Sequence, residues 1–197
     1  GSVAGIPARV IRVGFVGELG YEVHIPQHCG EALWDALICA GAEFSIKPFG
    51  IEAQRILRLE KGHIIIGQDT DAMSNPEEVQ MGWAIAKKKP FFVGGRSIQE
   101  LNKTPLKRSL VGFVINDLKA PIPLESHLVL DGDRMTGRVT SCNFSPTLNK
   151  PVGLAYVEPD RAEAGSYFKI KSSGGVMVDA VVVKLPFYDP ETQRQEL

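Results

Sequence analysis

From residue 108 onward, the chain consists of short, largely apolar runs with a β pattern, and this pattern most constrains the fold. The runs occupy residues 110–115, 128–130, 137–141, 151–157, 167–171 and 176–184. Turns containing glycine separate several of them, at 131–133, 164–165 and 172–175. Runs of this length that are bounded by turn residues predict β-strands. Several short strands at close spacing predict a small antiparallel barrel or sandwich.

The first half of the chain mixes helix and strand patterns, so the predicted fold class of the whole chain is α+β. Apolar residues at helical spacing predict helices over 30–41 and 50–60, and shorter ones over 76–83 and 98–102. An apolar run between glycines predicts a short strand at 64–66. The polar, proline-containing stretch 102–107 marks the change of pattern. We therefore predict one domain over residues 3–104 and a second over 105–197.

An alternating stretch, residues 11–25, predicts a β-hairpin with a candidate binding residue. The link between its strands contains Gly17 and Gly20, which tolerate the positive φ of a tight turn. In the second strand, Glu22 lies on the opposite face from Tyr21. A carboxylate held there can accept two parallel N–H bonds from a planar heterocycle such as a pterin or guanine. From spacing alone, the simpler interpretation is a strand glutamate that faces solvent.

Composition and charge argue against several classes of function. The net charge is −1, which gives no electrostatic reason to expect a nucleic acid or a membrane surface as partner. No apolar run approaches the roughly 20 residues of a membrane span. The three cysteines, Cys29, Cys39 and Cys142, are widely spaced, which predicts reduced thiols in a cytoplasmic protein. The four histidines have no metal-ligand spacing, so no metal site is predicted.

Two carboxylates in the loop after residue 66, Asp69 and Asp71, could suggest a cation site. Two carboxylates without further oxygen ligands are weak evidence for one. We predict instead that they cap local backbone or meet neighbouring arginines.

Several motifs, taken together, resemble the glycine-cleavage T-protein (aminomethyltransferase) family over essentially the whole chain. They are Gly-Glu-x-Gly-Tyr-Glu at 17–22, Leu-Arg-Leu-Glu-x-Gly at 57–62, Gly-Gln-Asp-x-Asp at 67–71, Gly-x-Val-Thr-Ser at 137–141 and Gly-Leu-Ala at 153–155. The resemblance implies the C-terminal portion of a folate-binding α+β domain, followed by the family's C-terminal barrel. It also implies that Glu22 grips the pteridine ring of tetrahydrofolate.

A narrower resemblance concerns the ending Phe-Tyr-Asp-Pro-Glu at 187–191 and the block at 62–71. Both are similar to α subunits of heterotetrameric sarcosine oxidases. The resemblance implies tetrahydrofolate as cofactor, with Glu22, Tyr21, Gln54, Arg58 and Tyr188 as the residues that bind it. Cleavage-system enzymes carry a folate-contacting arginine where this chain has Gln54, and the arginine at 55 points roughly 100° away around the helix.

The activity implied by this resemblance is an oxidase in which a flavin converts an N-methyl amine to an imine. Tetrahydrofolate then captures the carbon as methylenetetrahydrofolate. Flavin and NAD are expected only in missing regions or partner subunits, since no Gly-x-Gly-x-x-Gly opens a helix here. In the family, the catalytic aspartate lies in a region that would precede Val3. We therefore expect a C-terminal fragment without a catalytic residue of its own, inactive alone, whose partners are folate and the other oxidase subunits.

Three other functions stay open from the sequence. A glycine-cleavage aminomethyltransferase fits the family but not Gln54 or the ending at 187–191. A non-enzymatic folate-binding accessory protein for iron–sulfur proteins would carry Lys-Gly-Cys-Tyr-x-Gly-Gln-Glu, whereas this chain has His63 and Ile64 after the glycine and Asp69 in place of the glutamate. The third is a scaffold that keeps the fold without the ligand.

Overall fold

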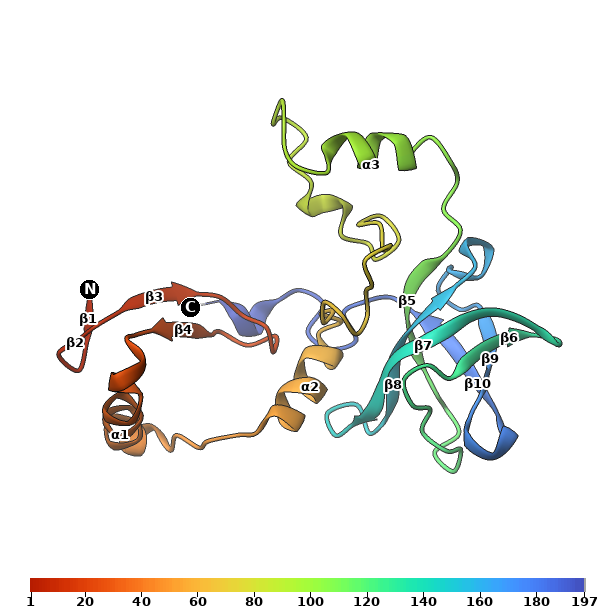
Figure 1. Ribbon diagram of the computed structural model, residues 1–197. Coiled ribbons are helices and arrows are strands. Elements are labelled where there is room, and N and C mark those ends of the chain that lie inside the picture. Colours follow the sequence, from red (N-terminus) through yellow and green to blue (C-terminus); the bar gives the residue numbers. More distant parts are fainter. Residues whose placement is uncertain (197) are drawn as a thin grey trace. The chain divides into compact units, whose positions relative to one another are not determined.

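The computed structural model describes residues 1–196, and the chain forms two units (Figure 1). Unit 1 holds residues 1–58 with the C-terminal residues from 191 onward, and unit 2 holds residues 59–190. The predicted α+β class is confirmed, because unit 1 combines hairpins with a helix and unit 2 contains an antiparallel barrel. The predicted domain boundary near residue 104 stays a prediction.

Unit 1 is built from two hairpins and helices. Strands β1 (Ser2–Val3) and β2 (Ile6–Pro7) pair with each other, and β3 (Arg9–Arg12) pairs with β4 (Tyr21–His24). Helix α1 (Gly30–Gly41) occupies the predicted range, between 3-10 helices at Gln27–Cys29 and Ala42–Phe44. A further 3-10 helix lies at Gln193–Gln195. Helix α2 (Ile51–Glu60) begins in unit 1 and ends in unit 2.

The β3–β4 hairpin is more exposed than its alternation predicted. All four residues of β3 are exposed, and in β4 only Val23 is partly buried. The register gives the reason, because Ile11 lies opposite Glu22 and Val10 lies opposite Val23. Directly opposed residues share a face of the sheet, so each face mixes apolar and polar side chains, and neither forms a continuous apolar face.

Unit 2 contains a closed antiparallel barrel whose strand order is β10-β5-β8-β7-β6-β9 (Figure 1). Its strands are β5 (Ser109–Val114), β6 (Leu128–Asp131), β7 (Arg134–Ser145), β8 (Lys150–Val157), β9 (Tyr167–Lys171) and β10 (Met177–Val183). Short 3-10 helices follow β8 at Pro159–Arg161 and β9 at Ser173–Gly175. All six predicted strand runs are confirmed, and closure leaves the sheet without an open edge.

Strand β8 is buried on both of its faces. Ala155 and Val157 belong to the apolar cluster that includes the fully buried Phe113 and Ile170. The alternate residues Val152, Leu154 and Tyr156 join a second cluster with Leu59 and Val79, which lie outside the barrel strands. Alternation along the strand sends successive side chains to opposite faces. The segment before the barrel therefore supplies part of the core of unit 2.

The segment between α2 and the barrel differs from prediction in two places. Residues 64–66 form no strand, because the turn after them closes on itself when the amide of Asp69 donates to the carbonyl of Ile65 at 2.9 Å. Residues 76–83 form turns and the start of a 3-10 helix (Gly82–Ala84). Gln80 has a φ of 58°, and its side-chain amide donates to the carbonyl of Leu110 at 2.8 Å, which interrupts helical geometry. Helix α3 (Gly95–Leu101) covers most of the predicted 98–102.

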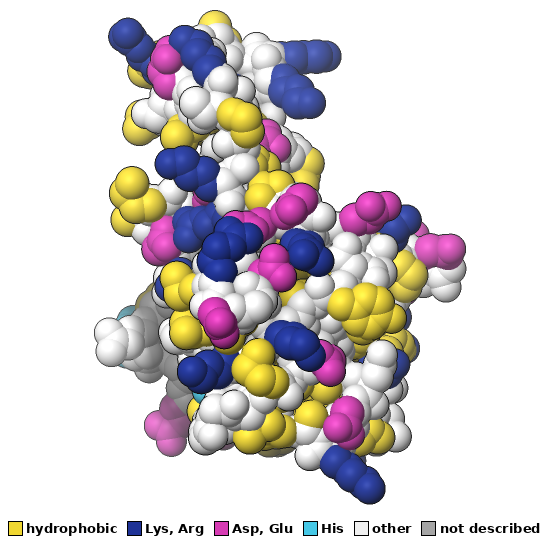
Figure 2. Space-filling model, turned by 90° about the vertical axis from the view of Figure 1, so that its right-hand side faces the viewer, with side chains coloured by type: hydrophobic (Ala, Val, Ile, Leu, Met, Phe, Trp, Pro, Cys, Tyr) yellow, Lys and Arg dark blue, Asp and Glu magenta, His cyan; other side chains and the backbone are white. Residues whose placement is uncertain are grey.

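Charged side chains of both signs are interspersed with hydrophobic ones on the face of the protein shown in Figure 2. In the described part of the chain, no helix is long and apolar enough to cross a membrane.

Candidate functional site

The predicted pterin-binding carboxylate lies on an accessible strand. Glu22 is in β4, and its side chain shares one face of the hairpin with His24, Ile11 and Arg9, according to the register. Its side chain is 59% exposed, and its Oε2 atom lies 3.1 Å from His24 Nε2. Tyr21 lies on the opposite face, as predicted. The carboxylate can therefore be reached by a ligand while its backbone is held in a sheet.

The link between β3 and β4 is fixed by contacts within unit 1. Gly17 takes a φ of 83°, and the amide of Val13 donates to the carbonyl of Gly20 at 3.1 Å. The Glu18 carboxylate accepts a bond from the guanidinium Nε of Arg194 at 2.5 Å, a charge-assisted pair between distant parts of the sequence.

Helix α2 places Gln54 and Arg58 one above the other, because residues four apart share a helix face. Gln54 is partly buried, whereas Arg58 is only 2% exposed. Arg55 points elsewhere and pairs with Glu52 at 3.5 Å. Burial this complete is unusual for an arginine, because a guanidinium is rarely buried unless it is paired.

The C-terminal end of α2 is joined to both the barrel and the chain's final segment. The Glu60 carboxylate accepts bonds from the Ser145 hydroxyl at 2.5 Å and the Thr147 hydroxyl at 3.0 Å. The Glu60 carbonyl accepts a bond from the amide of Tyr188 at 3.0 Å. Tyr188 therefore lies beside the end of the helix that carries Gln54 and Arg58.

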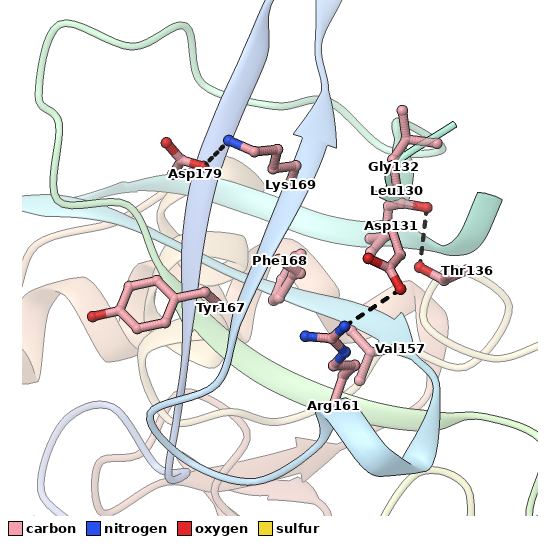
Figure 3. Close-up of a pocket in the computed structure, with 11 residues that line it drawn as sticks. Leu130, Asp131, Gly132, Thr136, Val157, Arg161, Tyr167, Phe168, Lys169 and Asp179 are labelled. Carbon is pink, nitrogen blue, oxygen red and sulfur yellow. Dashed lines mark hydrogen bonds and ion pairs between the residues drawn. The ribbon is translucent and has the colours of Figure 1, made fainter. Parts of the chain in front are cut away.

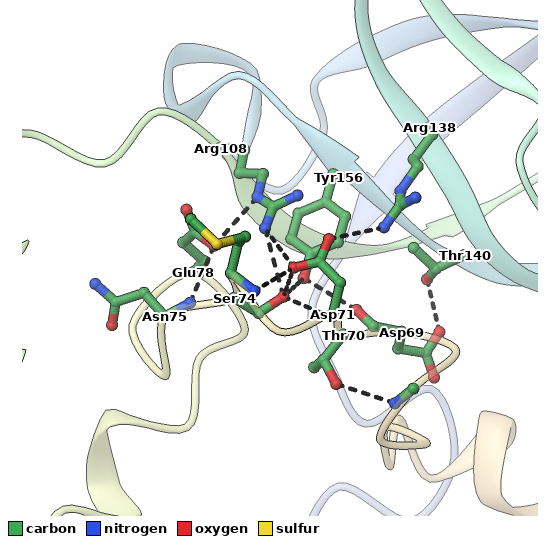
Figure 4. Close-up of polar contacts among 12 residues, drawn as sticks. Asp69, Thr70, Asp71, Ser74, Asn75, Glu78, Arg108, Arg138, Thr140 and Tyr156 are labelled. Atoms are coloured by element: carbon green, nitrogen blue, oxygen red, sulfur yellow. Dashed lines mark hydrogen bonds and ion pairs between the residues drawn. The ribbon is translucent and has the colours of Figure 1, made fainter. Parts of the chain in front are cut away.

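The loop after α2 is anchored on the barrel by the buried Asp69 (Figure 4). Its carboxylate accepts bonds from the hydroxyls of Thr140 and Ser141, each at 2.6 Å, and from the amide of Ile65 at 2.8 Å. Its carbonyl accepts a bond from the Tyr156 hydroxyl at 2.9 Å. This carboxylate is thus satisfied by protein donors, as a buried one must be.

Asp71 continues the same cluster toward the surface (Figure 4). Arg108 and Arg138 approach its carboxylate at 3.4 and 3.3 Å, and Arg108 lies 4.3 Å from the centre of the Tyr156 ring. A hydrogen bond from Ser74, together with Arg108, lowers the pKa of Asp71 despite an opposing effect of burial. Burial raises the pKa of Tyr156. The prediction that Asp69 and Asp71 meet backbone and arginines is confirmed, and the cluster joins the loop to the barrel.

A cavity of about 200 Å³ is lined mainly by residues of the paired strands β6 and β9 and of the neighbouring strands of the barrel (Figure 3). Val129, Val157 and Phe168 contribute its apolar lining. The charges at its rim pair with one another, Arg161 with Asp131 at 3.3 Å and Lys169 with Asp179 at 2.6 Å. Because these charges are already neutralised, the cavity offers no field of one sign to a ligand.

Within residues 1–196, no group of three or more histidine, cysteine or acidic side chains could hold a metal ion. The three cysteines are free.

The structure brings together only part of the predicted set. Tyr21 and Glu22 lie on adjacent positions of β4, and Gln54 and Arg58 share α2. Tyr188 joins the end of α2 through its backbone. The roles of these five residues in binding stay predictions.

Sequence reasoning missed one buried ion pair, between Lys61 and Asp189, at 3.2 Å. The two residues lie 128 positions apart. The only sequence signal was that each falls inside a family-like motif, at 57–62 and at 187–191.

Comparisons with known proteins agree over nearly the whole chain. A family model described as the GCVT N-terminal domain matches residues 1–89, and one described as the glycine cleavage T-protein C-terminal barrel domain matches residues 108–189. The chain is 38% identical to the sarcosine oxidase subunit alpha of Corynebacterium sp. (strain P-1), over 98% of this chain and 21% of that one. It is 35% identical to the aminomethyltransferase of Halothermothrix orenii, over 95% of this chain and 52% of that one.

A solved structure shows the same fold. The glycine cleavage system aminomethyltransferase T from Bartonella henselae matches with a TM-score of 0.82 and 27% identity, over 92% of this chain and 50% of that one. The chain therefore spans about half the length of these aminomethyltransferases and about a fifth of the oxidase subunit.

Proposed function

Because the chain belongs to the glycine cleavage T-protein family, we propose that it is the tetrahydrofolate-binding part of a sarcosine oxidase-like α subunit. In this proposal, the intact enzyme oxidises an N-methyl amine, and tetrahydrofolate bound here accepts the carbon to give methylenetetrahydrofolate. The flavin that supplies the oxidation, and NAD, would be bound by regions or subunits outside this chain. The three free thiols support a cytoplasmic location.

The observation that carries the proposal is the strand-held carboxylate of Glu22. A pterin presents a ring N–H and an exocyclic amine side by side, and one carboxylate can accept both bonds. Glu22 fits this requirement because its backbone is fixed by pairing with β3 while its side chain stays 59% exposed. Placing a binding group on a strand holds it more accurately than a loop would.

The other predicted residues are assigned supporting roles in the same proposal. Gln54 and Arg58, on one face of α2, would contact the parts of folate beyond the pterin ring. Tyr188 is assigned a folate contact as well. Tyr21 lies on the opposite face of β4 from Glu22, so it would act chiefly through the strand backbone and the packing of the hairpin.

The oxidase is favoured over the glycine-cleavage aminomethyltransferase by two sequence features, Gln54 at the position of the family's arginine and the ending at 187–191. Both kinds of relative match the chain at similar identity, so the aminomethyltransferase is the second candidate. The accessory-protein alternative is disfavoured because its cysteine is replaced by His63.

The experiment uses the full-length polypeptide that carries this chain, with its partner subunits. Calorimetry measures tetrahydrofolate binding, and product analysis follows methylenetetrahydrofolate after addition of sarcosine or, separately, of the aminomethyl donor of glycine cleavage. Binding with product from sarcosine supports the proposal. Product from the aminomethyl donor alone supports the second candidate, and no binding contradicts both.

A further inference from the structure

Lys61 and Asp189 form a buried ion pair that belongs neither to the barrel strands nor to the contacts of Asp69 and Asp71. The side chains of Lys61 and Asp189 are only 5% and 10% exposed. The Lys61 ammonium donates to the Asp189 carbonyl at 2.7 Å and lies 3.2 Å from its carboxylate. One side chain thus holds both the backbone and the side chain of the same residue. Such pairs add little to stability when compared with apolar packing, but their geometry is specific.

The two residues flank the contacts that join the final segment to α2. Glu60 immediately precedes Lys61. Its carbonyl accepts a hydrogen bond from the amide of Tyr188, and its carboxylate accepts bonds from the hydroxyls of Ser145 and Thr147. Asp189 has a φ of 49°, in the left-handed region, where aspartate and asparagine are the most readily accommodated residues apart from glycine. The backbone on both sides of the Tyr188 peptide is therefore fixed.

We infer that Lys61 and Asp189 are positioning residues that fix Tyr188 beside the end of α2 and thereby set the affinity for folate. The inference rests on the proposed function, because Tyr188 is assigned there to the folate site. Lys61 holds the residue immediately after Tyr188, and Glu60 holds Tyr188 itself. Loss of the ammonium would remove this donor from the Asp189 carboxylate and carbonyl, and the segment would be held less firmly.

The first measurement needs no ligand. Amide hydrogen exchange over residues 184–190 is compared in the wild type, Lys61→Met and Asp189→Asn. Both variants should exchange faster there, while β8 and β5 stay protected. Asp189→Asn keeps the shape and tolerates positive φ, so it serves if Lys61→Met does not fold. Lys169→Met, which breaks the exposed pair with Asp179, is the matched control and should leave this segment unchanged. Unchanged exchange in both test variants would overturn the inference.

The second measurement is a double-mutant cycle on tetrahydrofolate binding by the full-length polypeptide. We expect Lys61→Met and Asp189→Asn each to weaken binding about three- to tenfold, as for residues that act through a neighbour. When Tyr188→Ala is already present, Lys61→Met and Asp189→Asn should weaken tetrahydrofolate binding no further. If the two substitutions acted only by lowering stability, they would still weaken binding in that background. Equal losses in both backgrounds, or none in either, would overturn the inference. If the wild type does not bind folate, the proposed function fails together with the affinity step, and the exchange result still decides whether the pair holds the segment.

Discussion

The His24 Nε2 atom lies 3.1 Å from the Glu22 carboxylate, on the same face of β4. Both side chains are more than half exposed, so the contact contributes at most about 1 kcal/mol to stability. The consequence is useful for experiments, because Glu22 can be changed without unfolding the hairpin. Its effect on ligand affinity can then be measured separately from stability.

Glu22→Gln in the full-length polypeptide should weaken tetrahydrofolate binding roughly ten- to a hundredfold. The amide presents a donor where the pterin also has one, so a desolvated donor pair is left unsatisfied. Calorimetry measures the loss, and circular dichroism confirms that the fold is unchanged. Glu31→Gln, on an exposed position of α1, is the matched control and should bind as the wild type does. Unchanged affinity in Glu22→Gln would make Glu22 a solvent-facing strand residue.

Asp69→Ala should destabilise unit 2 by roughly 3 kcal/mol, because several buried donors lose their acceptor together. The donors are the hydroxyls of Thr140 and Ser141 and the amide of Ile65. Urea unfolding followed by fluorescence measures the change. Asp133→Ala, at an exposed turn between β6 and β7, should change stability by less than about 0.5 kcal/mol. Equal stability of the two variants would contradict the anchoring role.

Gly137→Ala should destabilise the barrel by about 3 kcal/mol or more, because an added Cβ would lie 1.9 Å from the carbonyl oxygen of Tyr156. That oxygen is backbone in the neighbouring β8, so it cannot move aside as a side chain can. Thermal unfolding measures the effect. Gly30→Ala is the control, since its added Cβ meets nothing within 4 Å and its helical position tolerates alanine. A Gly137→Ala variant that melts with the wild type would disprove this close approach.

Cys142 should resist alkylation at pH 8, whereas Cys39 should react readily. Burial raises the pKa of Cys142 to about 12, and only the thiolate is nucleophilic. At pH 8, about one Cys142 thiol in ten thousand would be ionised, and Cys39 is exposed. Iodoacetamide labelling followed by peptide mass analysis measures both rates. Denaturation should remove the difference, and equal rates in the native protein would show that Cys142 is accessible.

Local pattern was enough to predict the elements that neighbouring residues mark. The six strand runs after residue 108 and the helix over 30–41 are confirmed, because short apolar runs between turns and apolar residues at helical spacing are both visible in the sequence. Alternation with a period of two also predicted that Glu22 and Tyr21 lie on opposite faces of their strand. Local pattern failed at 64–66 and 76–83, where the bonds of Asp69 and the long-range bond of Gln80 replaced regular structure.

Only the tertiary structure decided which side chains meet across the sequence. Lys61 holds Asp189 at a separation of 128 residues, and Thr140 holds Asp69 at a separation of 71. The exposure of the hairpin likewise depended on register, which placed Ile11 rather than Val10 opposite Glu22. The physical reason is common to these cases. The sequence period determines which face of a strand or helix a residue occupies, but the partner of that residue depends on how distant segments pack. A buried charge or donor therefore finds its hydrogen-bond partner only in the packed tertiary structure.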